Sequence, residues 1–225
     1  ANYNSILGYM YLNRMQFDAA VEYIMRALEF YEKKSNYLEV AKCYNNLAIA
    51  HKRNQNSYMD VQKVIFYYTE AFKIWKLAGE YINAASALNN RAGVYIDIND
   101  IKNALEDLQR VFRMEGIQGN LEEARAYTNF GRLMEKKMNF LKAKEFYLKS
   151  LNIRLQHHAH DQLSIALSYE DLIKLYMHYF ESRQSYFESR QSYFESRQSL
   201  QDVYSWSESI LKIYTNQYGR AHPNT

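Results

Sequence analysis

Glycine and proline are scarce in this chain of 225 residues, which has 7 glycines and 1 proline. Because tight turns depend on these two residues, their scarcity argues against sandwiches, barrels and doubly wound folds and favours long helices with short links. The single cysteine, Cys43, excludes an intramolecular disulfide and suits a reducing compartment. No apolar run approaches the ~20 residues of a membrane span, and no signal-peptide pattern opens the chain. We therefore expect an all-α cytoplasmic protein that has no membrane partner.

An excess of charge of one sign is also absent. The chain carries 28 basic and 25 acidic side chains, for a net charge of +3. A protein that binds nucleic acid electrostatically needs a strong basic excess or a basic stripe, so we expect no nucleic-acid partner. Hydrophobic residues make up 48% of the sequence and aromatic residues 16%, which is enough to build a sizeable core.

A helical hairpin pattern returns about every 40 residues. In the first copy, apolar residues recur at spacings of three and four on both sides of the link 14–18, as expected for two amphipathic helices. Small residues at Gly8, Ala20 and Ala27 would let the two backbones approach closely. Residues that favour turns separate the copies, and they lie at 35–36, 79, 116–120 and 157–161. The landmark of the first helix recurs at Gly8, Ala48, Ala92, Gly131 and Ile173.

These positions carry a resemblance to a known family. Leu7, Gly8, Tyr11, Ala20 and Ala27 have the spacing of the tetratricopeptide repeat (TPR), whose usual unit has 34 residues. Units of about 40 residues resemble the long-repeat branch that includes the kinesin light chains. The resemblance implies a right-handed α-α superhelix, a TPR solenoid of about five helix hairpins, as a single domain over 1–225. The closing run 213–225 resembles a junction between kinesin-light-chain repeats, so we expect a fragment of a longer protein.

One segment departs from the repeat pattern. The heptad Tyr-Phe-Glu-Ser-Arg-Gln-Ser occurs three times in tandem over 179–199, within the last hairpin. Two extra heptads in helical form would add about 21 Å and rotate the helix phase by only about 40°. We interpret them as an expansion, native or engineered, that lengthens a helix or forms a surface excursion. The adjacent aromatics make a poor coiled-coil seam, but a helix that outgrows its hairpin could form a homodimer through residues 179–214.

Catalytic and cofactor motifs are missing from the sequence. It contains no glycine-rich phosphate loop, no Gly-x-Ser-x-Gly, no His-Glu-x-x-His and no Cys-x-x-Cys. The cluster His157–Asp161 resembles a metal site in composition, but it falls at a repeat junction where polar residues are expected anyway. Cys43 lies on a first-helix face, and a lone thiol there indicates packing. We expect no enzyme activity, no metal and no cofactor.

Asparagine recurs on the first helix of the middle three units. Helix pairs in a solenoid line a continuous concave surface with one helix of each pair. A carboxamide offers one acceptor and two donors, so a row of them can pair with the main chain of an extended peptide. The resemblance implies this role for Asn46, Asn90 and Asn129, whereas unit one has Ile6 and unit five has Asp171 at this position. The expected peptide-binding residues are Lys42, Asn45, Asn46, Asn89, Asn90, Arg125, Asn129 and Arg132.

These residues predict a protein-interaction scaffold that holds an extended partner segment in its concave groove. The basic side chains of the set would contact acidic side chains or a terminal carboxylate, so we expect an acidic segment. Alternatively, the asparagines bond to the next helix pair and fix the stacking. Two other functions stay open: a peptide-sensing regulatory domain, and a self-associating assembly module.

Overall fold

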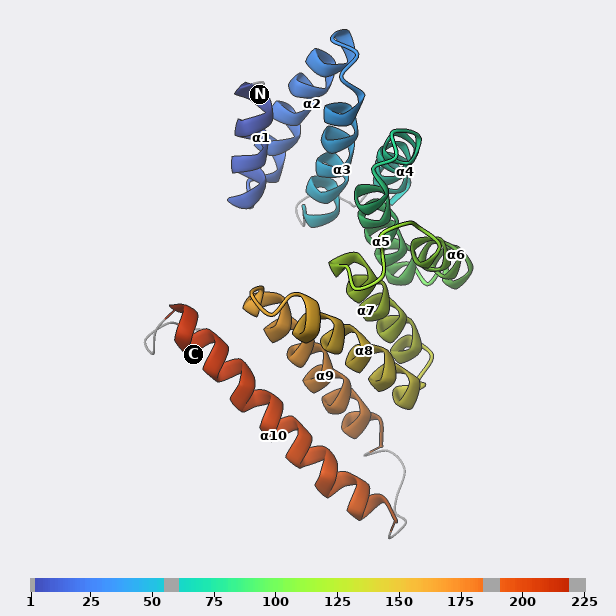
Figure 1. Cartoon of the computed structure of the whole chain (residues 1–225), viewed down its shortest axis with the longest axis vertical. Coiled ribbons are helices and arrows are strands. Elements are labelled where there is room, and N and C mark those ends of the chain that lie inside the picture. The colour runs from blue at the N-terminus through green and yellow to red at the C-terminus, as the bar shows by residue number, and fades with distance from the viewer. Residues whose placement is uncertain (1–2, 55–60, 184–190, 219–225) are drawn as a thin grey trace. The chain divides into compact units, whose positions relative to one another are not determined.

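Helices make up the regular structure of the computed structural model (Figure 1). The structure describes residues 3–54, 61–183 and 191–218, without the side chains of 180–199 and of residue 218. The helices are α1 (Tyr3–Asn13), α2 (Phe17–Lys33), α3 (Tyr37–Arg53), α4 (Val61–Leu77), α5 (Tyr81–Asp97), α6 (Ile101–Phe112), α7 (Leu121–Lys136), α8 (Phe140–His157), α9 (Gln162–Arg183) and α10 (Gln191–Tyr218). They form the hairpins α1/α2, α3/α4, α5/α6, α7/α8 and α9/α10. The prediction of an all-α chain of about five hairpins is confirmed.

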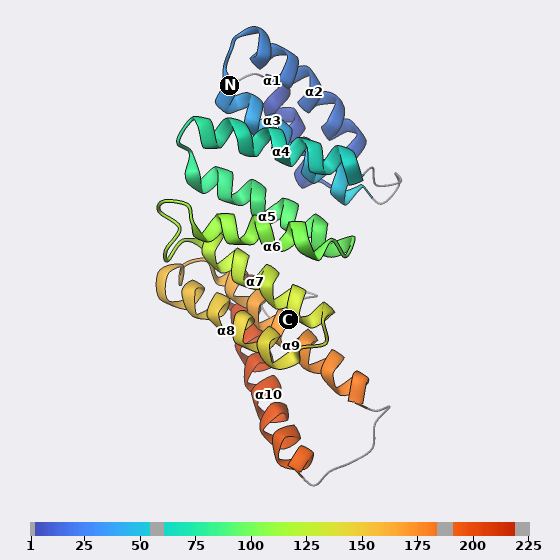
Figure 2. The ribbon, with the colours of Figure 1, turned by 90° about the vertical axis from the view of Figure 1, so that its right-hand side faces the viewer.

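The helices group into two compact units. Unit 1 covers Ala1–Gln118 and contains α1 to α6, and unit 2 covers Gly119–Thr225 and contains α7 to α10. Within each unit every helix packs against its neighbours in sequence, and in unit 1 α1 also contacts α3 (Figure 2). That a single domain spans 1–225 stays a prediction.

Small residues bring the two helices of a hairpin together, as predicted. A Cβ atom added to Gly8 would lie 2.6 Å from Cγ1 of Ile24, and one added to Gly131 would lie 2.5 Å from the Tyr147 ring. Ala20 and Ala27 on α2 are fully buried. Each side chain larger than these would force the backbones apart, so the hairpin crossing selects for residues of this size.

Hydrophobic clusters fill the space on both sides of each crossing. In unit 1, one cluster joins Leu12, Ile24 and Leu47, from three consecutive helices. A second cluster joins Ala48, Tyr68 and Val94. In unit 2, Tyr147, Leu151, Ile165, Leu172 and Leu175 form a core across α8 and α9. The apolar spacings of three and four in the sequence therefore mark the buried faces.

Five short links between helices share one backbone geometry. In each, a residue with positive φ stands two positions before the next helix: Met15, Ser35, Gly79, Asn99 and Met138. The N–H of that residue and the N–H after it bond to carbonyls of the preceding helix, as in Asn139 N to Met134 O at 2.9 Å and Met138 N to Glu135 O at 2.8 Å. This is the Schellman motif, in which glycine usually takes the left-handed position. Four of these five links use another residue, which explains how the chain turns so often with few glycines.

The triplicated heptad contributes to both helices of the last hairpin. Its residues 179–183 belong to α9 and 191–199 to α10, and residues 184–190 lie outside the described part. These two helices have 22 and 28 residues, against 11 to 18 in the other eight. In its described parts the triplicated heptad is helical, and its origin as an expansion stays an interpretation. Of the predicted repeat junction 213–225, residues 219–225 also lie outside the described part.

The left-handed methionines give a prediction about stability. Met15 and Met138 are exposed and have φ of 58° and 57°. A side chain in this conformation costs about 1 kcal/mol that glycine avoids, partly offset by the extra freedom of glycine in the unfolded chain. We expect Met138→Gly to raise the free energy of unfolding by about 0.5–1 kcal/mol, measured by urea denaturation followed by circular dichroism. Met138→Ala is the control, because it removes the same contacts and keeps the strained Cβ; an equal gain from alanine would contradict the explanation.

Candidate functional site

Two asparagines one repeat apart present unpaired carboxamides in unit 1. Asn46 on α3 and Asn90 on α5 are both partly exposed. Within the described residues neither side chain forms a hydrogen bond. The salt bridge from Lys52 to Asp97 (3.2 Å) joins the last turns of the same two helices. An exposed carboxamide whose donors and acceptor are all available can pair with both groups of a peptide unit.

The preceding asparagines, Asn45 and Asn89, each have a buried Oδ1 atom. Asn89 is 3% exposed. The Oδ1 atom of Asn45 is buried and accepts no hydrogen bond from a described residue. Adjacent helical residues point about 100° apart, so Asn45 and Asn46 cannot occupy the same face. The burial favours packing roles for Asn45 and Asn89 and surface roles for Asn46 and Asn90.

Lys42 lies one turn before Asn46 on the surface of α3. Its Nζ is 2.5 Å from Oε1 of Glu39, and its side chain is 56% exposed. An exposed pair of this kind contributes little to stability, so the ammonium can exchange Glu39 for another carboxylate at small cost. The structure therefore leaves Lys42 accessible beside an available carboxamide.

In unit 2 the predicted residues Arg125, Asn129 and Arg132 lie along α7. Arg125 is exposed and pairs with Glu122 at 3.0 Å. Asn129 is 9% exposed, and its Oδ1 accepts from Nη1 of Arg132 at 3.3 Å. Asn129 is thus more deeply buried than its counterparts Asn46 and Asn90. Nearby, Thr128 and Ser150 share a hydrogen bond of 2.8 Å that joins α7 to α8.

Asp171 on α9 occupies the asparagine position of the last unit. Its carboxylate is partly buried and forms no hydrogen bond or ion pair with a described residue. Burial raises the pKa of Asp171 from 3.8 to about 6, although Lys174, Arg154 and Arg132 oppose this rise. Sequence reasoning noted the departure from asparagine but gave Asp171 no role. The signal in the sequence was the carboxylate of Asp171 at a repeat position where the middle units have a neutral amide.

A buried arginine of α8 contacts α9 one turn before Asp171. Arg154 on α8 is 7% exposed, and Nη1 donates to Oγ of Ser168 on α9. Its Nε atom is buried and has no acceptor among the described residues. Burial lowers the pKa of Arg154, and the largest opposing influence is the charge of Asp171. Sequence reasoning missed Arg154, because nothing in its neighbourhood distinguishes it from a surface arginine.

A second buried arginine, in unit 1, has a complete set of partners. Arg91 on α5 donates from Nε and Nη2 to the two oxygens of Asp107 on α6, at 2.7 and 2.6 Å. Nη1 donates to Oγ1 of Thr69 on α4 at 2.6 Å. The guanidinium also lies 5.9 Å from the centres of the Phe72 and Tyr95 rings. Arg91 therefore joins three helices as a structural element and is not available to a ligand.

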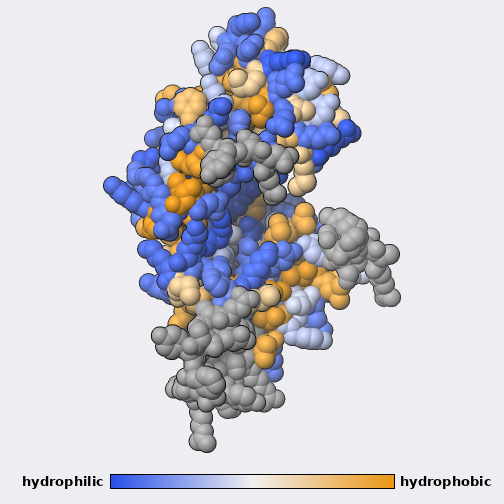
Figure 3. All heavy atoms as spheres, turned by 180° about the vertical axis from the view of Figure 1, so that it is seen from behind, coloured by the Kyte–Doolittle hydropathy of each residue, from blue (hydrophilic) through white to orange (hydrophobic). Residues whose placement is uncertain are grey.

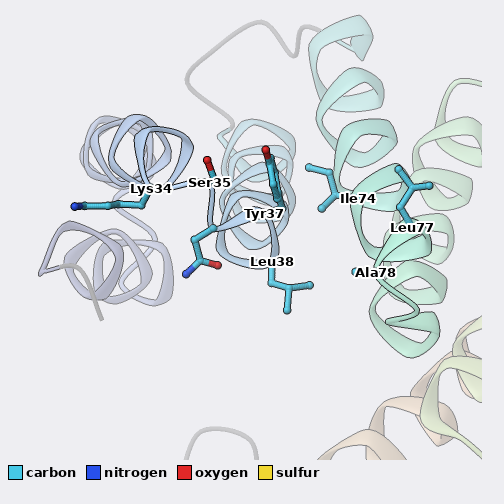
Figure 4. Close-up of a pocket in the computed structure, with 8 residues that line it drawn as sticks. Lys34, Ser35, Tyr37, Leu38, Ile74, Leu77 and Ala78 are labelled. Carbon is cyan, nitrogen blue, oxygen red and sulfur yellow. The ribbon is translucent and has the colours of Figure 1, made fainter.

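An open depression in unit 1 is lined by residues of α3, α4 and the link after α2. It has a volume of about 870 Å³ and is lined by the link after α2, the start of α3 and the end of α4 (Figure 4). Its lining residues are Lys34, Ser35, Asn36, Tyr37, Leu38, Ile74, Leu77 and Ala78. None of them belongs to the predicted peptide-binding set.

The histidine cluster at the junction of α8 and α9 packs against the chain. Nε2 of His158 is 3.0 Å from the carbonyl oxygen of Gly119, and the His157 ring packs close to the same glycine. Within the described ranges no three His, Cys, Asp or Glu side chains are grouped to hold a metal ion.

In the same ranges no helix is long and apolar enough to cross a membrane. On the face drawn in Figure 3, hydrophobic groups are interspersed among hydrophilic side chains.

Comparison with known proteins supports the repeat assignment. Residues 1–34 match the family Tetratricopeptide repeat. The fold is similar to the crystal structure of nearly identical TPR-like repeats from a kinesin-light-chain-like protein of Podosopora anserina, with a TM-score of 0.59 and 16% identity over 96% of this chain and 95% of that one. It is also similar to BtubC (BKLC) from P. vanneervenii, with a TM-score of 0.59 and 16% identity over 100% and 96% of the two chains. No curated protein matches the chain in sequence.

The fold is therefore that of a tetratricopeptide-repeat solenoid. It is similar to the fold of kinesin-light-chain-like repeats, the similarity that the length of the repeats predicted. The peptide-binding roles of individual residues and the homodimer through 179–214 stay predictions.

The unpaired carboxylate of Asp171 gives a prediction about pH. A buried acid whose folded pKa is raised loses stability as pH rises through the interval between the unfolded value of 3.8 and the folded value of about 6. We expect Asp171→Asn to stabilise the protein by about 1–3 kcal/mol at pH 7.5, and the gain to shrink as pH falls toward 4. Melting temperatures across this range measure it. Asp202→Asn is the control, because Asp202 pairs with Lys144 at 3.3 Å and its loss should not stabilise; a pH-independent effect of Asp171→Asn would contradict the assignment.

The thiol of Cys43 should react only slowly with thiol reagents in the folded protein. Burial, together with the charges of Glu39 and Glu32, raises the pKa of Cys43 to about 12. Only the thiolate attacks disulfides, so at pH 8 the folded protein offers almost none of the reactive form. We expect Cys43 to react with Ellman's reagent at least about 100-fold more slowly in buffer than in 6 M guanidinium chloride. Equal rates would show that α3 opens readily around this position.

Proposed function

We propose that the chain is a scaffold that holds an extended, acidic segment of a partner protein along its first-helix faces. The observation that carries this proposal is the pair Asn46 and Asn90, whose partly exposed carboxamides form no hydrogen bond within the described residues. They lie at equivalent positions of successive repeats, so they would contact an extended main chain at two separate points. Carboxamides that bind main-chain groups accept many sequences, which suits a scaffold.

The charges beside these asparagines favour an acidic segment. Lys42 lies one turn from Asn46, and its ion pair with Glu39 is exposed. In unit 2, Arg125 is likewise exposed and lies one turn before Asn129. Exposed cations that border a main-chain site attract carboxylates and select between partners more than they add affinity. The preformed helices would require little rearrangement on binding.

The proposal is tested by removing the two carboxamides. Peptides selected from a random displayed library against the chain serve as probes, and their affinities are measured by fluorescence anisotropy. Loss of two sets of main-chain hydrogen bonds at about 1 kcal/mol each predicts affinity about 10–30-fold weaker for Asn46→Ala/Asn90→Ala, with an unchanged melting temperature. Asn129 is not substituted. Because it is buried, its replacement by alanine would disturb packing as well as binding, and the two effects could not be separated.

The matched control is Asn152→Ala/Asn216→Ala. Both residues are exposed asparagines, but they lie on the second helices α8 and α10. This control should bind the peptides like the unaltered chain. Equal affinity of all three proteins would refute the carboxamide mechanism, and a lowered melting temperature in Asn46→Ala/Asn90→Ala would assign those residues to packing. If the selected peptides contained no acidic residues, the proposal that the partner segment is acidic would be refuted.

A further inference from the structure

Three leucines lie seven residues apart on the exposed face of α8. Leu141, Leu148 and Leu155 are 84%, 37% and 43% exposed. Seven residues are nearly two helical turns, so the three side chains form one row along the helix. A shallow hollow of about 410 Å³ is lined by Leu148, Leu155 and their neighbours on α8. Single exposed leucines are common on proteins, whereas a continuous apolar row is typical of an interaction surface.

The corresponding surface of unit 1 is mainly polar. Ala143 is the fourth residue of α8, and its buried counterparts Ala20, Val64 and Ala104 are the fourth residues of α2, α4 and α6. Leu141 and Leu148 lie two residues before and five residues after Ala143. At the same offsets unit 1 has Asp18, Met25, Gln62, Thr69, Lys102 and Gln109. Packing within a hairpin therefore does not require leucine at these positions.

Polar side chains border the leucine row on its exposed flank. Glu145, Lys149 and Asn152 are exposed, and Nζ of Lys149 lies 2.6 Å from Oε1 of Glu145. Lys149 also lies over the Phe146 ring, 5.5 Å from its centre, which keeps the ammonium on this flank. The opposite flank contacts α10, because Nζ of Lys144 is 3.3 Å from Asp202. The exposed flank thus has an acid, a base and a carboxamide.

This surface is complementary to a second copy of itself in antiparallel orientation. With Leu148 opposite Leu148 of the other copy, Leu141 lies opposite Leu155, because both are seven residues from Leu148. In such a pair the same flank of both helices meets. Glu145 then lies about 1.5 Å along the axis from Asn152 of the other copy and about 3 Å from its Lys149. The carboxylate gains an amide donor and a second ammonium.

We propose that the leucine row on α8 is a homodimer surface, on which a second copy of this chain packs its own α8 in antiparallel orientation. The surface is separate from residues 179–214 and contains none of the predicted peptide-binding residues. Two helices that meet along one face bury less than the about 1,200 Å² of a stable interface, so we expect a weak dimer with a Kd on the order of 100 μM.

Sedimentation equilibrium from about 10 μM to about 1 mM protein tests the proposal. The mean mass of the unaltered chain should rise toward twice the monomer mass. Leu141→Lys should weaken dimerisation at least about tenfold, because it removes an apolar contact at both ends of the symmetric pair. Leu141 is so exposed that this change should leave the melting temperature unaltered. Leu148→Lys places two ammonium groups opposite each other and should abolish the dimer.

The matched control is Leu77→Lys, which introduces the same charge at an exposed leucine of α4. This variant should dimerise like the unaltered chain. Leu200→Lys, at an exposed leucine of α10, separates the proposal from association through residues 179–214. Loss of the dimer in Leu200→Lys but not in Leu141→Lys would assign the interface to 179–214 and overturn the proposal.

Engineered cysteines report the orientation of the two helices. Leu141→Cys and Leu155→Cys chains are mixed, one of them with a mass tag, and oxidised mildly. An antiparallel pair should give a disulfide between the two variants and little linkage within either variant alone, because only residues 141 and 155 come close together. The native Cys43 is buried and should not compete.

The inference is overturned if the chain stays monomeric at about 1 mM, if Leu77→Lys dissociates the dimer as strongly as Leu141→Lys does, or if the engineered cysteines link only identical variants. These failures are separate from failure of the proposed function. Asn46→Ala/Asn90→Ala changes α3 and α5 and should dimerise like the unaltered chain, whereas Leu141→Lys should keep its affinity for the selected peptides.

Discussion

The close contact between the two helices of a hairpin is the constraint on which the rest of the structure depends. At Gly8 and Gly131 the second helix lies so near that even a Cβ atom would collide with Ile24 or Tyr147. Ala48 and Ala92 take the same position in the second and third hairpins and are fully buried. Once the crossing point is fixed, the helical period decides which residues point into the core and which point outward. Asn46, Asn90 and Asn129 all lie two residues before such a crossing, about 200° around the helix, and the neighbouring helices then decide that Asn129 is buried while Asn46 and Asn90 stay partly exposed.

The buried charged residues differ in how fully they are hydrogen-bonded. Arg91 and Asp107 satisfy each other with two hydrogen bonds, and Thr69 takes a third donor, so this pair stabilises the junction of α4, α5 and α6. Arg154 and Asp171 have comparable chemistry but no mutual hydrogen bond, and each keeps an unpaired group within the described residues. A completed pair stabilises the fold, whereas a buried group without a partner costs stability.

Particular residues show how far the sequence could predict the fold and the candidate site. The recurrence of Gly8, Ala48, Ala92 and Gly131 predicted the hairpins and their crossing points, because close packing of helices restricts residue size at a fixed period. The turns at Met15 and Met138 were not predictable, since their left-handed backbone is imposed by helices on both sides and not by the residue itself. The sequence spacing predicted the same peptide-binding role for Asn46, Asn89, Asn90 and Asn129. In the structure, however, Asn89 and Asn129 are buried, whereas Asn46 and Asn90 are partly exposed.

The sequence by itself determined the helical class, the number of hairpins and the faces that form the core, because all three follow from periodicity and side-chain size. Only the tertiary structure decided which asparagines are available to a partner. Exposure depends on the neighbouring helices, which bury Asn89 and Asn129 and leave Asn46 and Asn90 at the surface. The same holds for Asp171, whose unusual ionisation depends on burial and on charges carried by other helices, such as Arg132 on α7 and Arg154 on α8. Electrostatic neighbours of this kind are brought together by folding and carry no local sequence signal.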